Sequence, residues 1–165
     1  MKIQKKMEAA LNGQINAELY SEYLYLSMAA YFESLNLGGF ARWMEVQAGE
    51  EHSHAMKIYK FINERGGRVN LEAIDKPKSE WGSPQEAFEE AYAHEQKVTK
   101  MIHDLVDLAG QEKDHASFTM LQWFVDEQVE EEDSAGTIAE RLKAVKGAPQ
   151  ALFMMDQALG QRKDG

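Results

Sequence analysis

The sequence predicts an all-α protein: a four-helix bundle with one long crossover between the second and third helices, followed by a short fifth helix. Three observations lead to this prediction. Apolar residues recur at helical spacing over four long segments, and clear strand signals are missing. The three prolines, at positions 77, 84 and 149, all lie between these segments. Two of the connections within the bundle are short, whereas the middle one is much longer than usual between helices.

The first helix is predicted over about residues 5–34. The apolar residues that set its helical spacing are Leu11, Ile15, Leu19, Leu26 and Ala30. The sequence "NLGG" at 36–39 interrupts the pattern. A second helix then continues to "RGG" at 65–67, where a glycine is expected to end it.

Residues 68–83 show no helical period and form the middle connection. Ser83 is a candidate N-cap and Pro84 suits the first helical turn, so a third helix is predicted from here to about residue 112. A connection of this length can cross the whole bundle, which makes the second and third helices parallel.

The tight connection "KDH" at 113–115 leads into a fourth helix that ends near residue 146. The bundle therefore occupies about residues 5–146, and a short helix follows over about 149–161. We expect residues 1–165 to form a single domain, because this length matches one ordinary domain.

Composition and charge exclude several classes of protein. Hydrophobic residues make up 44% of the chain, which excludes a disordered protein. The net charge of −10 argues against nucleic-acid binding and suits the attraction of cations. No apolar run approaches the length of a membrane span and no signal-peptide pattern is present, so we expect a soluble, cytoplasmic protein. Cysteine is absent, which leaves oxygen and imidazole as metal ligands.

Two polar residues interrupt the inward line of the second helix. In "EVQAGEEHSHAMKIYKF", at 45–61, Glu51 and His54 are three residues apart and share a face with apolar neighbours. The apolar members of that line are Met44, Ala48, Ala55, Ile58 and then Phe61 or Ile62. Burial of a charge is costly unless something pairs with it, so these positions need an explanation.

The same interruption occurs on the other three helices. Glu18, Glu95 and Glu131 each lie at mid-length on the inward face of their helix, and Gln128 lies one turn before Glu131. A single glutamate on an apolar face is usually a boundary residue. Four at matching depth would repel each other by several kcal/mol unless divalent cations or bound protons neutralised them. This pattern favours a metal site inside the bundle.

Other polar residues have weaker claims. His94, His103 and His115 are interpreted as surface or helix-end residues, His52 points away from the Glu51 line, and Glu22 is a boundary residue. The tract "DEQVEEED" at 126–133 places Glu127 and Glu130 together, and Glu50 adjoins Glu51. Spacing alone leaves two possibilities open for these three glutamates: a solvated acidic face, or a hard-cation site of oxygen ligands beside the core.

The motifs resemble those of the non-haem ferritins of bacteria and archaea. They are "LNGQINAELYSEYLYLSMA", "EEHSHAMK", "YAHEQKVT" and "MLQWFVDEQVEEE", in that order, and the resemblance covers essentially the whole chain. It implies a ferritin-like bundle and an iron-storage cage of twenty-four subunits. It also implies a di-iron ferroxidase centre that oxidises Fe(II) with O2 or peroxide and stores Fe(III) as a mineral.

Carried over by position, the resemblance implies a role for each candidate residue. Glu18, Glu51 and His54 would bind one iron, Glu95 and Glu131 would bind the second, and Glu51 would bridge both. Gln128 matches a supporting glutamine and Tyr25 a tyrosine close to the centre. Glu50, Glu127 and Glu130 match an additional iron site, which Glu131 connects to the pair.

Two departures bear on the subclass. Helix four has Gln128 and Glu131 where a symmetric di-iron bundle carries Glu-x-x-His, so the second iron lacks a histidine. His52 stands where the haem-binding relatives place a methionine, so no haem is expected. The cysteine-free chain also cannot hold the cysteine-ligated iron of a rubrerythrin.

Alternative functions are a di-iron or di-manganese oxidoreductase acting on an organic substrate or peroxide, and a DNA-protecting mini-ferritin or plain interaction bundle. The first would need a pocket beside the metals. The second usually carries a basic tail, whereas the tail here, "GQRKDG", is short and mixed in charge. The fifth segment is too apolar for a free terminal helix, so we expect four of its residues to pack among neighbouring subunits. They are Leu152, Phe153, Met154 and Met155.

Overall fold

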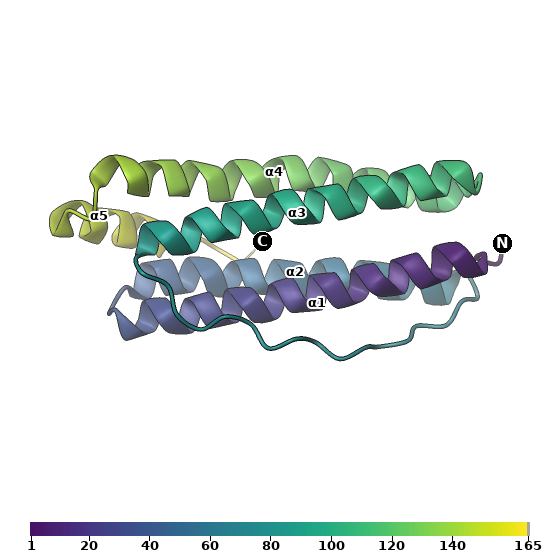
Figure 1. Ribbon diagram of the computed structural model, residues 1–165, viewed down its shortest axis with the longest axis horizontal. Coiled ribbons are helices and arrows are strands. Elements are labelled where there is room, and N and C mark those ends of the chain that lie inside the picture. The colour runs from purple at the N-terminus through teal and green to yellow at the C-terminus, as the bar shows by residue number, and fades with distance from the viewer. Residues whose placement is uncertain (165) are drawn as a thin grey trace.

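The computed structural model describes residues 1–164 and confirms the five predicted helices. They are α1 (Lys5–Ser34), α2 (Gly38–Glu64), α3 (Pro84–Gln111), α4 (His115–Val145) and α5 (Pro149–Leu159). The pair α1–α2 lies against the pair α3–α4, and α5 lies at one end of the bundle (Figure 1). No strand occurs within residues 1–164. None of the helices described is both long enough and apolar enough to cross a membrane.

The middle connection runs along the outside of α1 for the length of the bundle (Figure 1). Side chains of α1 hold it there: Asn12 Nδ2 donates to the carbonyl of Arg68 (3.0 Å), and Ser27 Oγ donates to the carbonyl of Lys78 (2.6 Å). This crossover returns the chain to the end where α2 began, so α2 and α3 run parallel as predicted.

The predicted helix-end signals at the crossover are confirmed. Ser83 Oγ accepts a hydrogen bond from the Glu86 amide (3.1 Å), and Pro84 occupies the first turn of α3. Gly66 ends α2 with a φ of 69°, a left-handed conformation that glycine adopts without strain.

The start of α2 has no cap of its own and takes one from α5. Its N-cap residue, Leu37, makes no side-chain hydrogen bond. Instead Asp156 Oδ1 accepts from the amides of Gly39 (2.7 Å) and Phe40 (3.0 Å). The terminal helix is therefore fixed to the bundle by a contact between residues more than a hundred positions apart.

The predicted packing of α5 among neighbouring subunits stays a prediction. Within the subunit, Leu152 and Met155 are partly buried against the apolar core. Phe153 and Met154 are 62% and 67% exposed, so their packing among subunits stays a prediction. Since the cap made by Asp156 turns one side of the short helix toward α2, that side is partly buried within the subunit.

Two of the apolar residues that set the helical spacing of α1 lie off its buried face. Leu26 is 44% exposed and Ala30 is exposed, while Tyr25 and Ala29 are buried in their place. Each step of four residues advances an α-helix by about 40° beyond a full turn, so repeated steps of four leave the buried face. The face that contains Glu18 is the one that points inward.

Two apolar clusters fill the bundle and leave a polar layer between them. One lies around the start of α3, where the crossover ends, and includes Tyr25, Phe32, Phe88 and Leu142. The other surrounds the start of α1 and includes Ile15, Ile58, Ile102 and Phe124. The candidate metal residues occupy the layer between the two clusters.

Candidate metal centre

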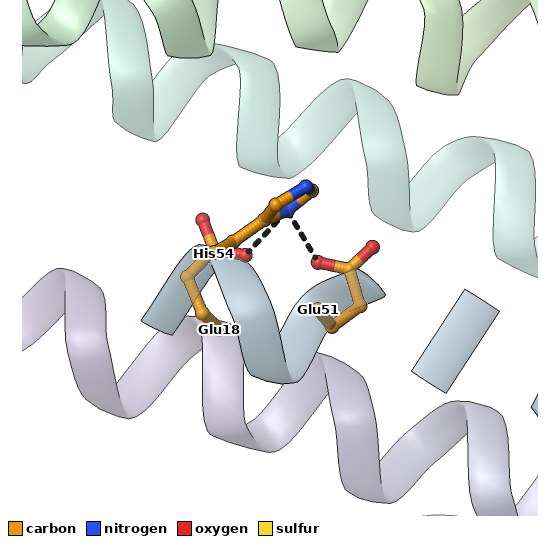
Figure 2. A group of neighbouring side chains, drawn as sticks. All are labelled: Glu18, Glu51 and His54. Carbon is orange, nitrogen blue, oxygen red and sulfur yellow. Dashed lines mark ion pairs between the residues drawn. The ribbon is translucent and has the colours of Figure 1, made fainter. Parts of the chain in front are cut away.

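The four inward-facing carboxylates meet in this polar layer, one from each long helix. Glu18, Glu51, Glu95 and Glu131 are at most 6% exposed, and His54 is 3% exposed. Figure 2 shows the His54 ring between the carboxylates of Glu18 and Glu51. Helical periodicity thus placed all five predicted inner residues at one depth of the bundle.

Ligand atoms form three overlapping groups, in each of which they lie within 4.8 Å of one another. The groups are Glu18–Glu51–His54, Glu51–Glu95–Glu131 and His54–Glu127–Glu131. Each of Glu51, His54 and Glu131 belongs to two groups. The arrangement can therefore bring two cations close together and share ligands between them.

The imidazole of His54 faces carboxylates on both sides. Nδ1 is 3.3 Å from Glu51 Oε2 and 3.8 Å from Glu18 Oε2. Nε2 is 3.8 Å from Glu127 Oε2 and 3.9 Å from Glu131 Oε1. Among residues 1–164, His54 Nδ1 and Glu18 Oε2 are buried without a hydrogen-bond partner. Unpartnered buried polar atoms are costly, and a cation bound between these two would satisfy both.

Two glutamines that sequence reasoning missed hold the carboxylates in place. Gln14 Nε2 donates to Glu18 Oε1 (3.0 Å), and Gln47 Nε2 donates to Glu51 Oε1 (2.9 Å) and also to Glu131. Each glutamine lies four residues before a glutamate of its own helix, a spacing at which side chains meet. That spacing was the signal available in the sequence.

Gln128 and Tyr25 both contact Glu95. Gln128 Nε2 donates to Glu95 Oε2 (3.2 Å), and the Tyr25 hydroxyl donates to Glu95 Oε1. Burial and the charge of Glu95 raise the pKa of Tyr25 well above its usual value, so its hydroxyl keeps the proton that it donates. Both predicted supporting residues therefore adjoin the centre.

Burial favours the protonated form of three carboxyl groups in the metal-free site. It raises the pKa of Glu51 well above its usual value, that of Glu95 to about 7 and that of Glu131 to about 8. Burial opposes charge on His54 as well, but the carboxylates of Glu18 and Glu51 beside Nδ1 outweigh it and raise the His54 pKa to about 11. For Glu18, burial acts to raise the pKa, and the His54 contact reverses this and lowers it. Bound protons neutralise the cluster until cations replace them.

The predicted outer residues are less closely assembled. Glu127 lies beside His54, and burial raises its pKa, but Glu130 is exposed. Glu50 forms an ion pair with Arg162, whose Nη2 is 3.0 Å from Glu50 Oε2. Of these three glutamates, only Glu127 belongs to a metal-compatible group within residues 1–164. The additional iron site stays a prediction.

One prediction about the other histidines is wrong. His94 is half-buried and not a solvated surface residue: it lies between α1 and α3, with its Nε2 2.8 Å from Ser21 Oγ. Burial, together with the charge of Lys97, lowers its pKa to about 4. The period of α3 alone does not reveal that α1 covers this flank. His52, His103 and His115 are exposed, as predicted.

Comparison with known proteins identifies the family. The family described as "Ferritin-like domain" matches residues 8–145. The chain belongs to the ferritin family. A bacterial non-heme ferritin of Bacteroides fragilis is 44% identical over 160 residues, which span 97% of this chain and 99% of that protein. One from Staphylococcus aureus is 38% identical, covering 97% of this chain and 96% of the relative.

Solved ferritin structures share the fold. The open-pore ferritin of the archaeon Archaeoglobus fulgidus is 56% identical, with a TM-score of 0.97, over 98% of this chain and 100% of that one. A closed form of the same ferritin, made by site-directed mutagenesis, is 55% identical, with a TM-score of 0.98, over 99% and 100%. This ferritin is therefore an iron-storage protein with ferroxidase activity, of the non-haem type that the sequence resembled.

Proposed function

We propose that this ferritin oxidises Fe(II) in pairs at the inner cluster. Glu18, Glu51 and His54 bind the first ion, Glu95 and Glu131 bind the second, and Glu51 lies between the two. The observation that carries the proposal is the buried, unpartnered pair of atoms, Glu18 Oε2 and His54 Nδ1, in a core that four carboxylates share. Nitrogen and oxygen donors of this kind suit Fe(II).

The residues of the centre contribute in different ways. Glu51, Glu95 and Glu131 give up protons as Fe(II) binds, because burial raises their pKa values in the metal-free site and a nearby cation favours ionised carboxylates. Two Fe(II) ions each lose one electron, and O2 takes both electrons with two protons to become hydrogen peroxide; peroxide as oxidant takes two electrons and two protons and becomes water. Tyr25 and Gln128 keep Glu95 oriented during this exchange.

Glu50, Glu127 and Glu130 form an additional iron site in this proposal, and Glu131 connects it to the pair. Its support is the 3.8 Å separation of Glu127 Oε2 from His54 Nε2, which puts an outer carboxylate in contact with the inner cluster. Fe(III) passes from there to the interior of a cage of twenty-four subunits in the cytoplasm and hydrolyses to a mineral. A net charge of −10 per chain suits such a cation-collecting shell.

An oxidoreductase that acts on an organic substrate is the less favoured alternative. The gap beside the centre, lined by Tyr25, Trp43, Gln47, Glu95 and Glu131 among others, has no room for even a water molecule. An organic molecule would have to displace core side chains to reach the ions. O2 and peroxide are small enough to need little rearrangement.

Stopped-flow oxidation of the first two Fe(II) ions per subunit tests the proposal. Glu51→Ala removes a shared ligand and should abolish the fast phase. The double variant Glu127→Ala/Glu130→Ala should keep that phase and change only the handling of later iron, such as the ratio of iron oxidised to O2 consumed. If the double variant loses the fast phase as completely as Glu51→Ala, the inner and outer residues form one site and the division proposed here is wrong.

A further inference from the structure

A residue of the C-terminal tail reaches the edge of the metal centre. Arg162 Nη2 donates to Glu50 Oε2 (3.0 Å) and to Gln47 Oε1 (3.0 Å), and Nη1 donates to the carbonyl of Trp43 (3.1 Å). The guanidinium also lies over the Trp43 ring, 4.3 Å from its centroid. The tail is thus held against α2 by a planar cation with several fixed contacts.

These contacts connect Arg162 to both parts of the centre. Glu50 is one of the three glutamates of the proposed outer site. Gln47 accepts from Arg162 with its oxygen, which turns its amide nitrogen toward Glu51 and Glu131. The Arg162 and Glu50 side chains are 19% and 32% exposed, so the ion pair is partly shielded from water.

A cation bound by Glu50 would meet the positive charge of Arg162. One carboxylate oxygen, Glu50 Oε2, already accepts from the guanidinium. Two positive charges at this distance repel each other, so Arg162 must leave Glu50 when a di- or trivalent ion binds there. Arg162 lies three residues beyond the last residue of α5, in the non-helical segment 160–164, so it can leave without unfolding a helix.

We propose that Arg162 is a tethered counter-ion of the outer acidic site, which neutralises Glu50 in the metal-free protein and is displaced when a cation binds. The inference rests on the proposed function, since it assigns Glu50 to a cation site. Arg162 thereby sets how tightly the outer site binds relative to the inner pair. A weaker outer site favours release of Fe(III) toward the mineral.

Terbium(III) binding tests the proposal without iron oxidation. Terbium is a hard, redox-inert cation that binds carboxylate oxygens, and a nearby indole such as Trp43 sensitises its emission. The metal-free assembled protein is titrated with Tb3+ under excitation of tryptophan. The binding phase lost in Glu127→Ala/Glu130→Ala reports the outer site, and the phase lost in Glu51→Ala reports the inner pair.

Arg162→Gln should tighten the outer phase by about fivefold, because a partly exposed ion pair contributes at most about that factor. Lys163→Gln removes the same charge from the adjacent, exposed position and should leave the phase unchanged. Arg42→Gln breaks the exposed contact between Arg42 and Asp164 (3.3 Å), so it loosens the tail while keeping Arg162, and it should also have no effect. Arg162→Lys should restore wild-type affinity.

A purely structural role for Arg162 predicts the opposite sign, since damage to the site would weaken binding. Weaker or unchanged outer binding in Arg162→Gln would therefore overturn the proposal. Absence of an outer phase from both the wild type and Arg162→Gln would also overturn it, while an intact inner phase would leave the paired ferroxidase centre standing. An outer phase present only in Arg162→Gln would support it. Loss of the inner phase from the wild type would instead count against the proposed function.

Discussion

Replacing Glu131 by glutamine should stabilise the metal-free protein although it weakens the metal centre. Glu131 is 6% exposed, and burial beside Glu95 raises its pKa from the usual 4.5 to about 8. The folded protein must therefore hold a proton that the unfolded chain releases above pH 4.5. Glutamine has the same shape, needs no proton and can still accept the hydrogen bond from Gln47.

The size of the effect follows from linkage. Each pH unit between the unfolded and folded pKa values lowers stability by about 1.4 kcal/mol, because the native state binds more protons than the unfolded state. pH 7 is about 2.5 units above the usual pKa of 4.5, so Glu131→Gln should raise the free energy of unfolding at this pH by about 3 kcal/mol. For a chain of 165 residues this corresponds to a rise in Tm of about 6–12 °C.

Chemical and thermal unfolding of the metal-free protein from pH 4.5 to 8 would measure this gain. The stability difference should be near zero at the acidic end, grow as the pH rises and level off near pH 8, the folded pKa of Glu131. Glu130→Gln is the matched control, because it removes an identical charge from an exposed neighbouring position. It should change stability by less than about 0.5 kcal/mol.

Saturating Zn2+ should reverse the order, since the wild type then gains binding free energy that Glu131→Gln has partly lost. A Glu131→Gln protein that is less stable than the wild type at pH 7 without metal, or whose advantage does not change with pH, would refute the reasoning. Either result would mean that the buried carboxylate is ionised and well stabilised without any cation.

Three further predictions concern other parts of the chain. As pH falls from 6.5 to 4, the wild type should lose about 2 kcal/mol more stability than His94→Gln, because His94 is protonated in the unfolded chain but not in the folded protein over this range. Stability curves of the two proteins that stay parallel over this pH range would contradict the prediction. Protein produced with ample haem should show no Soret band, since exposed His52 stands at the haem-ligand position, and stoichiometric haem would overturn the subclass. Gly39→Ala should lower stability by about 1–3 kcal/mol, because its Cβ would lie 1.7 Å from the Asp156 carbonyl oxygen. Gly38→Ala, with no atom within 4 Å, should be neutral, and equal Tm values for the two variants would disprove this packing argument.

The sequence determined the helices, their order and the residues of the inner cluster. Helical spacing is a local property, so it showed that Glu51 and His54 face inward together and that Glu18, Glu95 and Glu131 lie at similar depth. The length of the middle connection determined the parallel arrangement of α2 and α3, because a tight turn could not return the chain to the same end.

Local spacing did not show which flank of α3 is covered. It put His94 on the surface, whereas His94 is half-buried. Which flank of a helix is covered depends on its rotation about its own axis and on the helix that packs beside it. Neither quantity can be read from the period of a single helix. His94 is half-buried because α1 packs beside α3.

Contacts between distant segments were decided by the tertiary structure alone. Asp156 caps α2 and Arg162 pairs with Glu50, in both cases across more than a hundred residues. The sequence presents Arg162 as one charge in a short, mixed tail, and nothing local indicates its partner. The Asp156 cap holds α5 against the start of α2, and the residues that follow α5 return along α2 to Glu50 at the edge of the metal centre.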